Sequence, residues 1–167
     1  MIRKFKFTIF FVLCFFFITA ACVSVSLGSK NGKSYDNIFF NAPADPYSEL
    51  KVQSADRSWQ NTKNGNTISY MSNCEQTSEP TLEVLSSIAL DGVEDLKIVE
   101  KKKINYNGRE ALNTVLLGRV DGIPIQADLT VLKKNNCIFN ITYIGSIHTY
   151  MSDLSIFKKF WKDLTIK

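Results

Sequence analysis

The sequence contains a single histidine, His148, and only four cysteines among its 167 residues. It has no Gly-x-Ser-x-Gly segment of the kind that forms a nucleophile elbow, and no glycine-rich segment with the Walker spacing of a phosphate-binding loop. Two cysteines outside the N-terminal region and one histidine do not supply the four ligands of a zinc site. These absences argue against a zinc centre, a serine-hydrolase elbow and a P-loop, and they predict no cofactor.

Acidic residues are missing from the N-terminal region, because none precedes Asp36, whereas Arg3, Lys4 and Lys6 all lie there. The whole chain has 20 basic and 16 acidic side chains, so without those three the balance is 17 to 16, a net charge of +1. The basic character therefore belongs to the leader. A nucleic-acid-binding domain is expected to keep a clustered positive face, so we expect no nucleic-acid partner.

The first 22 residues have the layout of an export signal. Basic residues at 3–6 precede an apolar stretch at 7–18, followed by the small residues Thr19, Ala20 and Ala21 and then Cys22. This ending resembles the lipobox of bacterial lipoproteins, in which the cysteine is acylated and becomes the new N-terminus; leucine usually stands where Thr19 stands here. The resemblance implies a signal peptide at 1–21 and a lipidation site at Cys22.

Two alternatives to lipidation remain open. Ordinary cleavage would release a soluble protein, and an uncleaved leader could anchor the chain, because residues 7–27 carry no charge and about 20 apolar residues span a bilayer. Serines that alternate with apolar residues at 24–27 weaken that span. Val23 follows the cysteine, which by resemblance to enterobacterial sorting implies the outer membrane, with the protein facing the periplasm. We interpret residues 22–34 as the lipidated N-terminus and a flexible tether, and residues 35–167 as one domain.

The first half of that domain is expected to hold three strands and a helix. Strands are predicted at 35–41, around Trp59 and at 67–74, with Asn64-Gly65 as a hairpin turn. A helix follows, capped by Ser78 with Pro80 in its first turn and ending at Gly92. Its apolar face is predicted to consist of Leu82, Leu85, Ile88 and Ala89.

Residues 96–145 show the clearest pattern, four strands joined by turns at Asn107-Gly108, Asp121-Gly122 and Asn135-Asn136. Apolar residues alternate with polar ones, which predicts an antiparallel meander with one buried side. A final helix, capped by Ser152, carries an apolar stripe of Leu154, Phe157, Phe160, Trp161 and Leu164. Packing of this stripe on the sheet is the simpler interpretation, and a helix lying on a membrane is the alternative. The predicted fold class is therefore α+β, an antiparallel sheet with two packed helices.

Cysteine pairing follows from the compartment. Cys14 lies in the leader and Cys22 is the lipid site, so Cys74 and Cys137 remain. In an oxidising compartment such a pair favours a disulfide, which would close a loop of roughly 60 residues. Two buried thiols, or redox or metal chemistry, are the alternatives.

Catalysis has little support in the sequence. His148 could act as a general base with Ser146 or Ser152 as nucleophile, but it is more simply a polar loop residue. The carboxylate pairs Glu94–Asp95 and Glu79–Glu83 are explained by solvation and helix dipoles. The lysines at 101–103 are typical of an edge strand protected by charge, and an anionic-lipid or acidic-partner patch is the alternative. We predict no catalytic residues; an envelope hydrolase that uses His148 is the alternative function.

The order of elements from Tyr35 to Lys167 is strands, a helix, a four-stranded meander and a helix, and it resembles the α/β/α sandwich of the PsbP family of photosystem II extrinsic proteins. The layout of the segment from residue 80 to 160 is also similar to that of small lipoproteins of Gram-negative bacteria. The resemblance covers about four fifths of the mature chain and involves no chemical motif. It implies a non-enzymatic module that binds or assembles a partner, and the partner expected for this chain is an envelope protein.

Overall fold

The computed structural model describes residues 32–75 and 79–167. Seven antiparallel strands form the main sheet in the order β2-β3-β4-β8-β7-β6-β5, and a second sheet pairs β1 with β9. The strands of both sheets are β1 (Ile38–Phe39), β2 (Tyr47–Glu49), β3 (Arg57–Asn61), β4 (Thr67–Asn73), β5 (Glu94–Tyr106), β6 (Arg109–Val120), β7 (Ile123–Lys134), β8 (Cys137–Ser146) and β9 (Thr165–Ile166).

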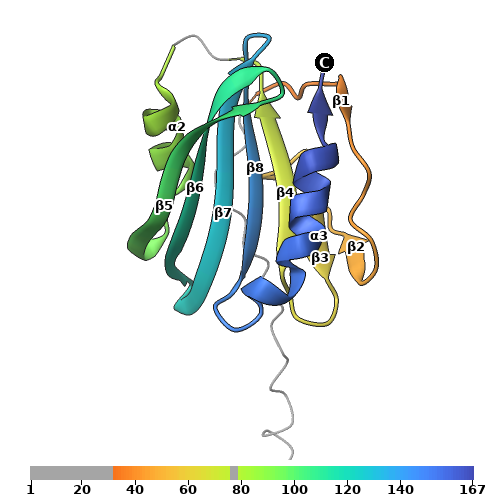
Figure 1. The fold of residues 1–167 in the computed structure, drawn as a ribbon, viewed down its shortest axis with the longest axis vertical. Helices are drawn as coiled ribbons and strands as arrows, with labels where there is room; N and C mark the ends of the chain where they lie inside the picture. Colours follow the sequence, from red (N-terminus) through yellow and green to blue (C-terminus); the bar gives the residue numbers. More distant parts are fainter. Residues whose placement is uncertain (1–31, 76–78) are drawn as a thin grey trace, which may run out of the picture.

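Two helices pack on opposite faces of the main sheet. Helix α2 (Leu82–Ala89) lies over β6 and β7, and helix α3 (Tyr150–Asp163) packs on β7 and β8 from the other side. Figure 1 shows α3 in front of the sheet, towards the β4 side, and α2 beside β5 and β6. This architecture confirms the predicted α+β class and the α/β/α layering.

Both faces of the meander are buried, so the prediction of one buried side was wrong. Leu129 and Val131 of β7 point towards α2, whereas Phe139 and Tyr143 of β8 point towards α3. Side chains alternate between the two faces along each strand as predicted, but the apolar set of β7 lies on the opposite face of the sheet from the apolar set of β8. The sheet therefore has two cores, because a helix covers each side.

Tight turns join the strands of the meander as the sequence predicted. Both residues of Asn107-Gly108, Asp121-Gly122 and Asn135-Asn136 have positive φ, the conformation that a two-residue hairpin turn needs. Asn64-Gly65 also joins two strands, but within that pair only Gly65 has positive φ. The asparagine, aspartate and glycine positions thus set the register of three hairpins.

Element boundaries differ from the predictions in several places. The strand predicted at 35–41 is reduced to Ile38–Phe39 and pairs with β9, outside the main sheet. Thr81, whose hydroxyl accepts a hydrogen bond from the Val84 amide, is the N-cap of α2, while Ser78 lies outside the described residues. Thr149 takes the N-cap position of α3 in place of Ser152. Ile88 is 61% exposed, not part of the buried face.

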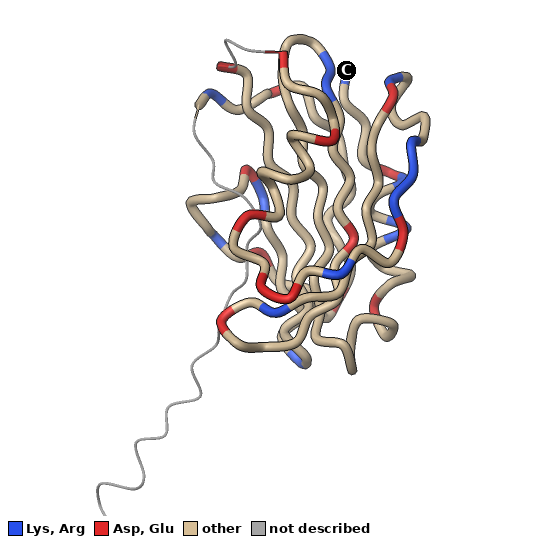
Figure 2. The backbone as a smooth tube through the Cα atoms, turned by 90° about the vertical axis from the view of Figure 1, so that its left-hand side faces the viewer, with Lys and Arg blue, Asp and Glu red and all other residues tan. Residues whose placement is uncertain are grey.

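Strand β5 forms one edge of the sheet, as the lysines at 101–103 indicated. Its residues are exposed up to Lys103, and two register shifts against β6 mark bulges near each end of the Leu96–Val99 segment. Figure 2, which views the molecule from this side, shows both signs of charge interspersed. Charged side chains and bulges both hinder edge-to-edge pairing, so this edge is protected.

The predicted signal peptide, Cys22 and most of the tether lie outside the described residues. The end of the predicted tether does lie on the domain, because the Cys74 amide donates to the Lys33 carbonyl and the Ser34 hydroxyl donates to Asp56. Over 32–75 and 79–167, neither helix combines the length and apolar character needed to cross a bilayer.

Candidate functional site: the open face of strands β5 to β7

His148 lies exposed in the link between β8 and α3, and within the described part of the chain it makes no hydrogen bond. The two serines proposed as its nucleophile are engaged with Thr149. Ser146 shares a hydrogen bond with the Thr149 hydroxyl, and Ser152 donates to the Thr149 carbonyl. The structure therefore does not assemble a Ser–His pair here, and the predicted hydrolase site has no geometric support.

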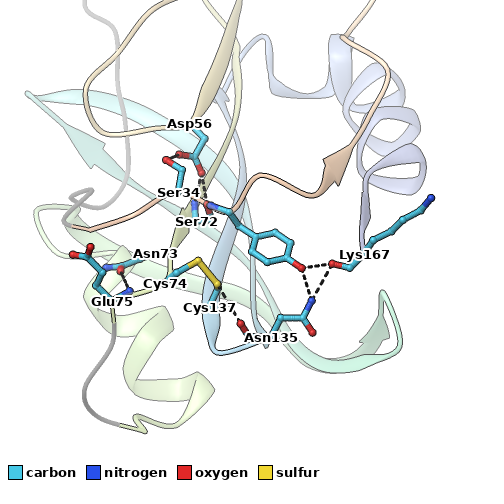
Figure 3. The surroundings of a disulfide bond; sticks show 10 residues. Ser34, Asp56, Ser72, Asn73, Cys74, Glu75, Asn135, Cys137 and Lys167 are labelled. Atoms are coloured by element: carbon cyan, nitrogen blue, oxygen red, sulfur yellow. Dashed lines mark hydrogen bonds between the residues drawn. A yellow bond between two sulfur atoms is a disulfide. The ribbon is translucent and has the colours of Figure 1, made fainter.

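Cys74 and Cys137 form a disulfide, the pairing expected from the sequence, with their Cα atoms 4.1 Å apart. The bond joins the residue after β4 to the first residue of β8 (Figure 3). Two strands that are 63 residues apart in sequence are thus tied where their ladder ends. The position indicates a structural bond between the two halves of the sheet.

The predicted carboxylate pairs do not form a site either. Glu79 pairs with Lys133 and Glu83 lies near Lys103, while Glu94 starts an edge strand instead of lying near a helix end as expected. No three histidine, cysteine, aspartate or glutamate side chains of residues 32–75 and 79–167 gather as metal ligands would.

One half of the α3 side of the sheet carries no described helix, and we call it the open face. Figure 1 shows β5, β6 and the lower half of β7 uncovered beside α3. Strand pairing places half-buried Val115 and Leu117 of β6 on this surface, next to Gln126 of β7. On the flank of α3, Met151 is 69% exposed. The open face thus presents apolar side chains beside charged ones.

Asp128 is the most unusual residue at this surface, because its side chain is only 1% exposed and yet it is charged. One carboxylate oxygen accepts from the Asn113 amide at 2.6 Å, and the other pairs with the Lys158 ammonium at 3.0 Å. A buried carboxylate is stable only with such partners. The ion pair therefore holds α3 against β7 at the border of the open face.

A second chain of hydrogen bonds continues this network along α3. Thr130 accepts from both the Asn113 amide and the Trp161 indole, and the Trp161 ring stacks on Tyr106 at 4.3 Å. The Tyr106 hydroxyl in turn donates to the Trp161 carbonyl. Alternation along the strand had predicted solvent-facing positions for Asp128 and Thr130. The sequence offered one indication of these contacts, because Lys158 and Trp161 are spaced to lie on the same flank of a helix.

Replacing Lys158 by methionine is expected to lower the free energy of unfolding by about 2 kcal/mol, because Asp128 then keeps only Asn113 as its partner. Lys159→Met is the matched control. Lys159 pairs with Asp163 near the surface in the last turn of α3, so its replacement should leave the denaturation midpoint unchanged. Urea denaturation followed by tryptophan fluorescence measures both. Equal midpoints for the two variants would contradict a structural role for the Lys158 pair.

A polar hollow of about 550 Å³ lies beside the disulfide. Three cations line it, Arg109, Lys133 and Lys134. Lys133 pairs with Glu79, and Lys134 donates to the carbonyls of Asn107 and Ile166. These contacts explain the lysines as structural, so the open face remains the better candidate site.

Comparison with known proteins supports the fold. No protein-family model matches the sequence, and no curated protein matches it. Among solved structures, LpqN of Mycobacterium tuberculosis, described as involved in cell envelope biogenesis, is similar with a TM-score of 0.59 and 12% identity, covering 83% of this chain and 86% of its own. The cyanobacterial PsbP protein CyanoP of Synechocystis sp. PCC 6803 is similar with a TM-score of 0.58 and 8% identity, covering 90% and 99%. The chain therefore has a PsbP-like fold, as the order of its elements predicted.

Proposed function

We propose that this chain is a lipid-anchored module of the bacterial cell envelope that binds a partner protein through the open face and performs no catalytic step itself. Acylation at Cys22 would hold the module at the outer membrane, facing the periplasm. The leader sequence supports this address, and the similar structure of LpqN, a protein described as involved in cell envelope biogenesis, agrees with it.

The composition of the open face is the observation that carries the binding proposal. Half-buried Val115 and Leu117 lie between α3 and β5, where the register places Lys97 opposite Leu117 and Glu100 opposite Val115. The neighbouring Lys102 pairs with Glu100 at 2.9 Å. Apolar side chains in the middle of a surface with charged residues around them are typical of protein interfaces. The occupant that fits is a protein segment with apolar residues opposite β6 and a carboxylate opposite Lys97.

The polar groups buried nearby are used for structure, which supports a role without catalysis. Asp128, Asn113 and Thr130 satisfy one another and the two α3 side chains. A group that already binds a fixed partner is poorly placed to accept a proton from a substrate. The surface therefore offers shape and charge to a partner.

Crosslinking in intact cells tests the binding proposal. A photo-crosslinking residue in place of Met151 is expected to give one discrete heteromeric product, and the same residue in place of Val84, exposed on the α2 side, should not. A second substitution, Leu117→Asp, should abolish the product while leaving the denaturation midpoint within a few degrees. Crosslinks from Met151 to lipid alone, or products that persist with Leu117→Asp, would contradict the proposed surface.

Palmitate labelling with membrane fractionation tests the anchor separately. Wild-type chain is expected to take up label and sediment with outer membranes, and Cys22→Ala should lose the label. An unlabelled wild-type chain would contradict the proposed lipid anchor.

Substitution of His148 tests the alternative function. A His148→Ala variant that loses the phenotype of the wild type would favour the envelope hydrolase over the binding module.

A further inference from the structure

One cation of the polar hollow beside the disulfide has no partner in the fold. Arg57 pairs with Glu49 at 3.7 Å, on another part of the surface. Arg119 donates to the Gly122 carbonyl at 2.6 Å. The exposed guanidinium of Arg109, by contrast, makes no hydrogen bond or ion pair with any residue of 32–75 or 79–167. The two lysines of the hollow hold neighbouring segments, so Arg109 is the cation that is free to bind a ligand.

The strands around the hollow fix the position of the Arg109 backbone. Arg109 pairs with Tyr106 where the ladder between β5 and β6 ends, and Tyr106 is buried against Trp161. From β7, Lys134 donates to the Asn107 carbonyl at 3.0 Å and so ties the β5–β6 turn to its neighbour. Figure 1 shows the β5–β6 and β7–β8 turns at the same upper end of the sheet. A ligand held between fixed turns loses less free energy to ordering of the protein.

Asn136 supplies a second free donor at the hollow. It takes the second position of its turn with φ 59°, whereas Gly108 and Gly122 take that position in the other two turns of the meander. Glycine adopts this conformation at a lower cost than a residue with a side chain, so the turn itself gives no reason for an asparagine. The Asn136 side chain lines the hollow, and its amide makes no hydrogen bond within the described part of the chain. This amide is therefore free to donate to an occupant.

The charges around the hollow favour an anion with two negative charges. Three cations and one carboxylate line it, Arg109, Lys133, Lys134 and Glu79, which leaves a net charge of +2. Lys134 binds only neutral carbonyls, so no acid compensates its charge. The Glu79 side chain is 89% exposed, and an ion pair with such a partner contributes little. Positive charge is thus concentrated here, in a chain that is nearly neutral without its leader.

A neighbouring hollow of about 460 Å³ also contains Arg109 and Lys133, but its charges are better balanced. Lys103 adds a third cation there, while Glu83 and Glu110 add two carboxylates, so the net charge is +1. Lys103 lies within 3.9 Å of Glu83 and 3.1 Å of Glu110. The hollow beside the disulfide is therefore the better anion site of the two.

We propose that the hollow beside the disulfide binds a phosphate group, with the Arg109 guanidinium and the Asn136 amide as its donors. The planar guanidinium matches two phosphate oxygens at once, and the amide serves a third. A phosphate monoester carries a charge of about −1.5 to −2 at pH 7, which matches the charge of the hollow, whereas a carboxylate would match only half of it. The group could belong to a free compound or to a phospholipid headgroup. The site lies outside the open face, so its test does not depend on the proposed function.

Titration of the full chain with inorganic phosphate tests the site. The chain is kept in neutral detergent micelles, chloride holds the ionic strength constant, and NMR follows the backbone amides of the turn at 135–136. These signals are expected to shift with a saturable dependence on phosphate in the wild type and in the matched control Arg119→Ala, another exposed arginine. Arg109→Ala should abolish the shift at an unchanged denaturation midpoint. A wild type without saturable shifts, or equal affinity in Arg109→Ala, would overturn the proposal.

A second variant and a second anion test the donors and the charge. Asn136→Gly suits the turn and so keeps the fold, but it should weaken phosphate binding about tenfold, because a hydrogen bond to a charged group is lost. Acetate at the same ionic strength should bind about tenfold more weakly than phosphate, since it carries half the charge. Full affinity in Asn136→Gly would remove the amide from the site, and equal affinities for the two anions would overturn the assignment to phosphate.

Phosphatidic acid added to the micelles distinguishes the two sources of the group. If the ligand is a lipid headgroup, phosphatidic acid should shift the same turn signals at a lower concentration than inorganic phosphate does. If the ligand is a free compound, only inorganic phosphate should shift them. Either result supports the site when Arg109→Ala abolishes it. Shifts that phosphatidic acid produces equally in the wild type and in Arg109→Ala would overturn the proposal.

Discussion

Replacing Asp153 by alanine is expected to lower the free energy of unfolding by about 4 kcal/mol, a large loss for a single polar side chain. Asp153 lies in the first turn of α3 and is buried. One of its oxygens accepts hydrogen bonds from four side chains of the β2–β4 region: Asn61 at 2.8 Å, Asn64 at 2.9 Å, Asn66 at 2.8 Å and Tyr47 at 3.3 Å.

The loss is large because several donors become unsatisfied together. Asn66 is fully buried, and its amide also donates to the Thr149 carbonyl, so it cannot turn to solvent. Asp153→Asn should cost less, since it keeps an acceptor and the shape of the side chain. Asp163→Ala, in the last turn of the same helix, is the control and should leave the midpoint unchanged. Urea denaturation measures all three, and a loss below about 1 kcal/mol for Asp153→Ala would contradict the network.

The same network predicts how stability depends on pH. Burial alone raises the pKa of Asp153, but the hydrogen bonds from the three asparagines and Tyr47 outweigh it and lower the pKa below its ordinary value. A group whose pKa is lowered on folding stabilises the fold above its unfolded pKa of about 4, and this contribution is lost as the pH falls through the folded pKa. Between pH 5 and pH 3, roughly the range in which Asp153 titrates, the free energy of unfolding should therefore fall less for Asp153→Ala than for the wild type.

Removing the disulfide with Cys74→Ser and Cys137→Ser together is expected to lower the free energy of unfolding by about 4 kcal/mol. The bond spans 63 residues, so its loss frees a long loop in the unfolded chain. The native contacts of β4 with β8 remain, so the double variant should still fold in the cold but unfold at a lower temperature.

Thermal denaturation with and without reductant checks this prediction. The wild type should lose stability when reduced, and the double variant should not respond to reductant at all. Cys22→Ala, which leaves the disulfide in place, is the control. An unchanged midpoint for the reduced wild type would show that the bond contributes nothing to the fold.

Much of the local structure could be predicted because it depends on neighbours in the sequence. The pairs at 107–108, 121–122 and 135–136 adopt positive φ, since asparagine, aspartate and glycine tolerate that conformation. Phe157 and Phe160 identified the buried face of α3 for the same reason, because their spacing matches the helical repeat. Cys74 and Cys137 were the only cysteines left to pair outside the leader.

Other features could not be read from the sequence because they depend on distant partners. Alternation shows which residues of a strand share a face, but not which face a helix will cover, so Leu129 and Tyr143 were expected on the same side. Asp153 and Asp128 look like ordinary surface acids until β3, β4 and α3 meet around them. Nothing in the local pattern distinguishes a solvated carboxylate from a buried one.

The sequence by itself determined the two helices, the hairpins of the meander and the pair of cysteines, because short-range torsional preferences and side-chain periodicity decide these. Only the tertiary structure decided that β4 and β8 join the two halves of the sheet, that α2 and α3 take opposite faces, and that parts of both faces have no described helix over them. The physical reason is that strand order and burial depend on contacts between segments far apart in the chain, whose free energies no local window of residues contains.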